Sequence, residues 1–183
     1  AAFSKALMMK IPPISLSVDD VLIAPLQADD APELAAITDA SVTQRIDFLP
    51  AEFGLADAQL LIAQMTDQNV HHAVRQKSDG KLLGVIGVHV RHGADGPAFE
   101  TGYWFAAEAR GRGLAGRCVS AVVRHLVGVA AGCAVVAECA PANRRSWALL
   151  HRIGFQSLGV NGQRTGRRLL QWAGVAGQRI DVC

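Results

Sequence analysis

Long apolar runs are scarce in this sequence, although half of its 183 residues are hydrophobic. The longest run, Leu126 to Ala137, has 12 residues and is interrupted by Gly128 and Gly132. A helix that crosses a bilayer needs about 20 apolar residues, so this run predicts a helix end followed by a buried strand. The segment from Ala1 to Ile14 holds only a short apolar stretch, and no signal peptide is expected there.

Cysteine pairs and metal-ligand spacings are also missing. The chain has four cysteines, which are Cys118, Cys133, Cys139 and Cys183. None of them forms a CxxC pair and the histidines show no zinc-ligand spacing, so we expect no metal site. Nothing in the cysteine spacing suggests a disulfide framework, which favours a reducing, cytoplasmic location.

A large excess of either charge is absent. The formal net charge is +2, which is too small to favour nucleic acid or an anionic membrane as a partner. Charged residues make up 19% of the chain, a balance typical of a folded globular domain. Pro12 and Pro13 break the start of the chain, so we expect a flexible extension over residues 1–14 and a single domain over residues 15–183.

The apolar residues alternate between the 3.6-residue period of a helix and the two-residue period of a strand. The expected helices are residues 30–37, 55–67, 112–127 and 144–153. The expected strands are residues 21–26, 72–77, 81–91, 99–106, 133–139, 155–160 and 168–172. This order predicts an α/β (α+β) fold, in which one mixed, mostly antiparallel sheet of about six or seven strands carries helices on both faces.

The segment from Glu108 to Gly116 joins a strand directly to an amphipathic helix. Gly111 and Gly113 allow a sharp turn and a close approach of the backbone to a ligand. The first amides of the helix have no intrahelical acceptor and lie at the positive end of the helix dipole. Arg110 and Arg112 add charge, so the segment predicts a phosphate site, although it matches neither a Walker loop nor a dinucleotide fingerprint.

Three motifs occur in the order and spacing of one known family. Arg110-Gly111-Arg112-Gly113-Leu114-Ala115 resembles the Arg/Gln-x-x-Gly-x-Gly/Ala signature of GNAT acetyltransferases. The earlier Thr101-Gly102-Tyr103-Trp104-Phe105 and the later Asn143-Arg144-Arg145-Ser146 resemble the branch that acetylates ribosomal-protein N-termini (RimJ/RimL-like). The resemblance covers about residues 21–172 and implies the GNAT fold and transfer of an acetyl group from acetyl-CoA to an amine.

The resemblance also implies the residues that bind acetyl-CoA, the expected co-substrate. Backbone groups of Phe105 and Ala106 would hold its amide-containing arm and polarise its carbonyl. Its pyrophosphate would bind at Arg110, Gly111, Arg112, Gly113, Leu114, Ala115 and Gly116. Asn143 and Ser146 would contact the arm near the sulfur, and Asn143 is equally a good N-cap for the helix that follows.

Attack of an amine on a thioester needs a base that accepts the amine proton. Glu100 is the first candidate, because it lies on the same strand face as Gly102 at the end remote from the phosphate loop. His89 is the second candidate, since it lies opposite the glutamate if Val90 faces Phe99. Each residue also has a purely structural alternative: Glu100 could be an ordinary surface carboxylate at a strand end, and His89 could be a histidine that only packs in its strand.

The departing thiolate needs an acid or a hydrogen-bond donor. Many members of the family carry a tyrosine at the position of Leu150, and its absence here leaves Ser146 as the candidate acid. A serine in the first turn of a helix is the structural alternative. Cys118 and Cys139 lie in apolar patterns and are expected in the core rather than in an acyl-enzyme.

The sequence leaves the acceptor open. The branch resemblance favours a peptide or protein N-terminus, with an amino sugar or a polyamine as alternatives. Asp47, Glu52 and Asp57 could attract a cationic amine. Two other functions remain alternatives: a catalytically silent CoA-binding sensor and a nucleic-acid-binding module. No membrane partner is expected, and the sequence leaves open whether the protein forms a homodimer. The basic residues of such a module would be Arg144, Arg145, Arg164, Arg167 and Arg168.

Overall fold

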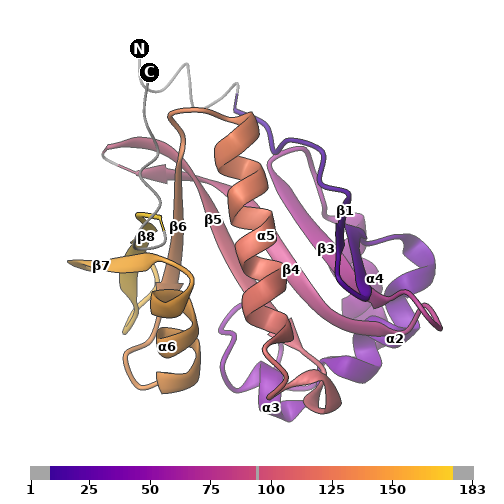
Figure 1. Ribbon diagram of the computed structural model, residues 1–183. Coiled ribbons are helices and arrows are strands. Elements are labelled where there is room, and N and C mark those ends of the chain that lie inside the picture. The colour runs from indigo at the N-terminus through magenta and orange to yellow at the C-terminus, as the bar shows by residue number, and fades with distance from the viewer. Residues whose placement is uncertain (1–8, 94, 175–183) are drawn as a thin grey trace.

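The computed structural model describes residues 9–93 and 95–174 of the chain (Figure 1). Its helical elements are η1 (Ala28–Asp30), α2 (Ala31–Ile37), α3 (Ala40–Thr43), α4 (Leu55–Ala63), η2 (Ala107–Ala109), α5 (Leu114–Val129) and α6 (Arg144–Arg152). Its strands are β1 (Leu16–Val18), β2 (Val21–Pro25), β3 (Asn69–Gln76), β4 (Leu82–Gly93), β5 (Gly96–Phe105), β6 (Ala134–Cys139), β7 (Phe155–Asn161) and β8 (Arg168–Trp172).

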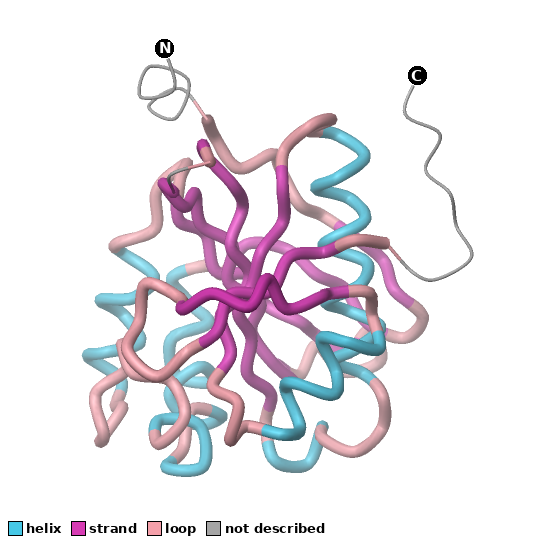
Figure 2. The backbone as a smooth tube through the Cα atoms, turned by 90° about the vertical axis from the view of Figure 1, so that its left-hand side faces the viewer, coloured by secondary structure: helices cyan, strands magenta, loops and turns pink. Residues whose placement is uncertain are grey.

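The strands form one sheet in the order β1-β2-β3-β4-β5-β6-β8-β7. Every neighbouring pair is antiparallel except β5 and β6, which are parallel. Helices lie on both sides of the sheet, as the end-on view in Figure 2 shows. The predicted class and layout are therefore confirmed, with eight strands rather than six or seven. The additional strand, β1, has three residues and is too short to show a period in the sequence.

Helix α5 packs one apolar stripe against the sheet, as expected of the amphipathic helix predicted there. Cys118, Val122 and Leu126 are completely buried, and Leu114 is nearly so. The helix begins two residues later than predicted, because Gly113 has a left-handed φ of 70° and stands outside the helix as its N-cap. Because the helix starts at Leu114, its first free amides lie directly after the glycine turn.

The segment before β3 departs from the prediction. Helix α4 ends at Ala63, earlier than expected, because Thr66 and Asn69 pair across a tight turn that leads into β3. The preceding α3 was not predicted, because four residues carry too little period to be recognised. These short elements bring the chain between α2 and α4 over one end of the sheet.

Residues 9–14 belong to the expected N-terminal extension, and residues 1–8 lie outside the described part of the chain. The Ile11 amide donates a hydrogen bond of 2.7 Å to the carbonyl of Asp67, and Ile14 is 1% exposed. These six residues thus lie against the domain. Within residues 9–93 and 95–174, no helix has the length and apolar character needed to cross a bilayer.

The parallel pair of β5 and β6 holds together over only three residues of each strand. Ala98 to Glu100 pairs with Ala134 to Val136, and Glu100 is the last residue of β5 in register with β6. Beyond that point β5 runs on to Phe105 and β6 to Cys139 without pairing to each other. The sheet therefore splits into two arms, which leaves one edge of β5 open towards the glycine turn before α5.

Candidate functional site

A cavity of about 690 Å³ occupies the split between β5 and β6. Its wall is built from β4, β5, β6, the start of α5, the face of α6 and the segments around residues 41–48 and 164–167. Of the predicted site residues, all but Ala106 and Arg112 line this cavity. The Asn143 to Ser146 motif, which is distant in the chain from the other two motifs, thus meets them at one place.

The loop before α5 has the backbone form that its glycines predict. Gly111 and Gly113 both have left-handed φ angles, 78° and 70°. A Cβ placed on Gly111 would meet no atom within 4 Å, so the loop has open space beside it. The first amides of α5, from Leu114 to Gly116, follow at once and have no intrahelical acceptor. This arrangement can bind a phosphate group through the backbone.

The arginines of the loop are held by other parts of the protein. Arg110 donates from Nε to the carbonyl of Phe105 (3.0 Å) and from Nη2 to Ser41 Oγ (2.9 Å). Arg112 donates from Nη2 to the Glu108 carbonyl at 2.7 Å. The amides of α5 are open to an anion in this conformation, and Arg110 fastens the end of β5 to α3.

Ala106 has a structural task that the sequence did not reveal. Its amide donates to the carbonyl of Leu83 at 2.9 Å, and its own carbonyl accepts from the amide of Ala109 at 3.0 Å. The turn η2 uses these groups, which leaves the open edge of β5 ending at Phe105.

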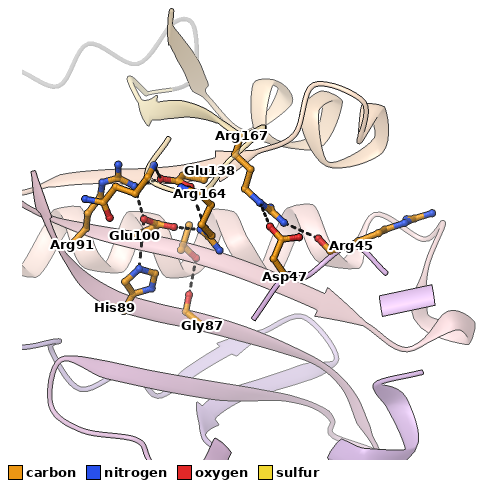
Figure 3. Close-up of polar contacts among 11 residues, drawn as sticks. Arg45, Asp47, Gly87, His89, Arg91, Glu100, Glu138, Arg164 and Arg167 are labelled. Atoms are coloured by element: carbon orange, nitrogen blue, oxygen red, sulfur yellow. Dashed lines mark hydrogen bonds and ion pairs between the residues drawn. The ribbon is translucent and has the colours of Figure 1, made fainter. Parts of the chain in front are cut away.

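Glu100 lies inside a network of ion pairs (Figure 3). It is 2% exposed, so the reading of it as a carboxylate on the surface is wrong. Arg91 Nη1 stands 2.7 Å from Glu100 Oε2, and the Arg164 guanidinium pairs with the other carboxylate oxygen. Both arginines also pair with Glu138, a buried residue of β6. The network joins β4, β5, β6 and the loop before β8 at the point where the sheet splits.

Both carboxylates of the network stay ionised at neutral pH. Burial alone would raise the pKa of Glu100, but hydrogen bonding and charge from His89, with Arg91 and Arg164, lower it below its ordinary value. Burial acts on Glu138 in the same direction, yet Arg91 and the amides of Gln163 and Arg164 lower the pKa of Glu138 to about 2. Glu100 is thus a fixed negative charge rather than a free base.

His89 faces Glu100 across β4 and β5, as predicted. The register pairs Val90 with Phe99 and His89 with Glu100. His89 Nε2 lies 3.5 Å from Glu100 Oε2, and the histidine side chain is 42% exposed. A proton taken up by this imidazole would be stabilised by the carboxylate behind it.

Asn143 is the N-cap of α6, since its Oδ1 accepts a hydrogen bond of 3.3 Å from the amide of Ser146. Ser146 lines the cavity, and a neighbour that the sequence did not identify lies beside it. This neighbour is Tyr103, which is the only tyrosine of the chain. Within the described part of the chain, its buried hydroxyl has no partner at hydrogen-bonding geometry. Burial raises the pKa of Tyr103 to about 12, against a smaller lowering by the Ser146 side chain.

An aromatic group forms the wall of the cavity away from α6. The rings of Phe48, His71 and Trp104 lie with their centroids 6.0 to 6.4 Å apart. Burial lowers the pKa of His71 to about 4, so this ring is uncharged at neutral pH. Sequence spacing could not have identified this wall, because the three residues come from a loop and two strands that meet only in the fold.

Two of the three acidic residues expected to attract an acceptor have other partners, and the third, Glu52, is exposed and does not line the cavity. Asp47 pairs with Arg167 at 3.0 Å, and Asp57 accepts a hydrogen bond from the Gly54 amide at the start of α4. Two of the arginines assigned to a nucleic-acid surface are also occupied, because Arg164 pairs with Glu100 and Arg167 pairs with Asp47. The residues described contain no group of three or more His, Cys, Asp or Glu side chains that could hold a metal ion.

Comparisons with known proteins agree with the predicted family. The family model described as "Acetyltransferase (GNAT) domain" matches residues 20–156, whereas no curated protein sequence matches the chain. A GNAT-family acetyltransferase from Bacillus anthracis has a similar structure, with a TM-score of 0.74 and 17% identity over 86% of this chain and 97% of that one.

Two further solved structures share the fold. The ribosomal-protein-S5-alanine acetyltransferase of Vibrio fischeri has a TM-score of 0.72 and 16% identity, over 91% of this chain and 99% of that one. RimL, a ribosomal L7/L12 alpha-N-protein acetyltransferase solved with coenzyme A, has a TM-score of 0.72 and 15% identity, over 90% of this chain and 100% of that one. Likeness at these identities shows a common architecture.

Proposed function

This chain belongs to the GNAT acetyltransferase family, and on that premise we propose that it acetylates the free amine of a peptide or protein N-terminus, with acetyl-CoA as the donor. The choice of acceptor is supported by the likeness to ribosomal-protein acetyltransferases, and acetyl transfer to an amine is supported by one observation. His89 and Glu100 lie at the apex of the split between β5 and β6, at the opposite end of the cavity from the backbone amides of the phosphate loop. A donor bound by those amides and extended along β5 would bring its reactive end to this pair.

The residues of the cavity fit acetyl-CoA, which supplies the acetyl group as an activated thioester. The turn at Gly111 and Gly113 offers open space beside the amides of α5 for a pyrophosphate. The edge of β5 from Thr101 to Phe105 is not paired with β6, so its backbone groups can bind the amides of the arm.

We assign the role of proton acceptor to His89 and a supporting role to Glu100. The carboxylate is held by Arg91 and Arg164, and its lowered pKa makes it a weak base. As the amine attacks, His89 accepts its proton, and the fixed charge of Glu100 stabilises the imidazolium. The proton of the amine therefore leaves through the exposed side of the imidazole.

Ser146 is the group placed to donate a hydrogen bond to the departing thiolate. It lines the cavity at the start of α6, near the helix N-terminus, where a developing negative charge is favoured. Its neighbour Tyr103, whose pKa of about 12 keeps the phenol protonated, can donate in turn to the serine oxygen. Such a chain of donors stabilises the thiolate without a charged acid.

The test is release of free thiol from acetyl-CoA in the presence of peptides with free or blocked N-termini, a polyamine and an amino sugar. We expect release with the free peptides alone. Release with only the polyamine or the sugar would replace the proposed acceptor, and CoA binding without release from any acceptor would identify a sensor. The cysteine pattern keeps the cytoplasm as the predicted location.

A further inference from the structure

One face of the central sheet carries an ordered patch of residues beside the apex of the split. Directly paired residues of neighbouring strands share a face, and every second residue along a strand returns to it. From β3 through β4 to β5, the three rows of this patch are Asn69–His89–Glu100, His71–Gly87–Gly102 and Ala73–Val85–Trp104. A row with two glycines thus separates the proposed base from a tryptophan.

Gly102 leaves a hollow in this patch. It is exposed, whereas its neighbours on the same face of β5, Glu100 and Trp104, are buried. A Cβ placed on Gly102 would meet no heavy atom within 4 Å, and its φ is not left-handed. The backbone conformation therefore does not require glycine at position 102. The effect of the missing side chain is an open space above this part of β5.

The hollow has an uncharged, aromatic wall, here called the niche wall, made of Phe48, His71 and Trp104. His71 leans over Gly87, since a Cβ on that glycine would lie 3.3 Å from His71 Cδ2. Trp104 is fixed by a hydrogen bond of 3.1 Å from its Nε1 to Thr38 Oγ1. Phe48 is 54% exposed and thus offers apolar surface at the mouth of the cavity.

The charges around the hollow disfavour a polycation. The two carboxylates that line the cavity, Glu100 and Glu138, are each paired with Arg91 and Arg164. Arg45 lines the cavity and points away from the ion pairs in Figure 3, where it adds positive charge at the rim. An acceptor with several ammonium groups would meet repulsion here, whereas an apolar group would meet aromatic rings.

We propose that the hollow over Gly102 receives an apolar group carried next to the reacting amine, and that the absence of a side chain at this position sets the size of that group. The inference rests on the proposed function, because it places the amine at His89 and the adjoining group one row away on the same sheet face. Successive same-face residues of a strand are about 7 Å apart, which suits an amine and the side chain next to it. The substrate class is thus a primary amine with a bulky apolar neighbour.

The experiment measures binding of amino acid amides to the CoA-loaded protein by calorimetry, so the readout does not depend on turnover. Glycinamide, alaninamide, leucinamide and phenylalaninamide are the probes. We expect leucinamide or phenylalaninamide to bind at least about tenfold more tightly than glycinamide, because each methylene in an apolar pocket is worth roughly tenfold or more. Equal affinity for all four amides would overturn the inference.

Three variants and one matched control locate the effect. Gly102→Val, assayed at a CoA concentration that saturates the variant, should remove the preference for the larger amides. Gly102→Ala should remove part of it, and Gly128→Ala is the matched control, because it adds the same carbon at an exposed site on α5 with open space around it. Phe48→Ala, at an exposed residue, should weaken leucinamide binding several-fold and keeps the inference testable if the valine variant does not fold.

The two proposals fail in different ways. If the amides show the expected preference but no amine is acetylated, the proposed function is wrong and the hollow stands as an amine-binding site. If amines are acetylated with no preference for a bulky apolar group, or if Gly102→Val leaves the preference intact, the inference about Gly102 is wrong. The proposed acetyltransferase function would then still hold.

Discussion

His89 and Glu100 face each other across β4 and β5 with 3.5 Å between Nε2 and Oε2, at the last residue where β5 still pairs with β6. Because of this position, the pair lies in the part of the sheet where β5 and β6 are still hydrogen-bonded, and it also lines the cavity. Arg91 and Arg164 hold the carboxylate in place, and the histidine remains partly exposed.

Replacement of the proposed base gives the first prediction. We expect His89→Gln to lower kcat by about a hundredfold or more, because general bases contribute on the order of 10² to 10⁴ in rate. His92→Gln, at an exposed residue further along the same strand, is the matched control and should leave kcat unchanged. A normal kcat in His89→Gln would assign the base elsewhere.

Glu138 gives a prediction about stability and pH. Its pKa of about 2 lies below the ordinary value of 4.5, so its carboxylate stabilises the fold above that range. This stabilisation is lost as the pH falls from about 4.5 towards 2. We expect Glu138→Gln to lower the free energy of unfolding at pH 7 by about 3 kcal/mol and to flatten its dependence on pH below 4.5, as measured by urea denaturation.

The control for that variant is Glu52→Gln, at an exposed glutamate that has no ion pair among the described residues. It should leave the unfolding curve unchanged at both neutral and acid pH. If Glu138→Gln is as stable as the wild type at pH 7, the network does not fasten the split in the sheet.

Gly113 gives a prediction about the donor site. Its φ of 70° strains any other residue, and a Cβ there would lie 3.4 Å from Arg117 Nη1, beside the amides of α5. We expect Gly113→Val to weaken CoA binding by roughly tenfold or more, measured by calorimetry. Gly80→Val is the matched control, because Gly80 has a similar φ of 72° in a hairpin turn far from the cavity. Unchanged CoA affinity in Gly113→Val would move the pyrophosphate to another site.

Tyr103 gives a prediction that ultraviolet absorbance can check, since no other tyrosine is present in the chain. Its phenol should stay protonated in the folded protein until the pH approaches about 12, whereas an exposed tyrosine ionises near 10. Since unfolding releases this proton more readily, the fold should lose stability as the pH rises from about 10 towards 12. Ionisation of the folded protein near pH 10 would show that the hydroxyl is not buried.

The Tyr103→Phe variant separates structure from catalysis. Removing a buried hydroxyl that has no partner should not lower the free energy of unfolding. We expect this variant to be at least as stable as the wild type and to turn over several-fold more slowly, because the donor behind Ser146 is lost. A loss of about 1 kcal/mol in stability would mean that the hydroxyl is hydrogen-bonded in solution.

The parts of the site with local causes could be predicted from the sequence. The glycine turn before α5, the N-cap at Asn143 and the apolar stripe through Cys118 all depend on residues within a few positions of one another. The position of His89 opposite Glu100 also follows locally, because a short connection between two antiparallel strands fixes their register.

The rest depends on contacts between distant parts of the chain. Arg164 reaches Glu100 from a loop 64 residues later, and nothing near either residue indicates the pairing. The arginines of the loop predicted contacts with a phosphate ligand, but Arg110 donates hydrogen bonds to the Phe105 carbonyl and to Ser41 within the protein. The hollow at Gly102 can be recognised only when β3, β4 and β5 are aligned in the structure. From the sequence alone, a glycine inside a strand predicts only a locally weakened strand.

The central claim is direct transfer of an acetyl group from acetyl-CoA to an amine. It is tested most directly by incubating the protein with acetyl-CoA labelled in the acetyl group and a peptide with a free N-terminus, followed by mass spectrometry of both peptide and protein. We expect the label on the N-terminus of the peptide and none on the protein. Label on a cysteine such as Cys139, or on neither molecule although CoA binds, would contradict direct transfer.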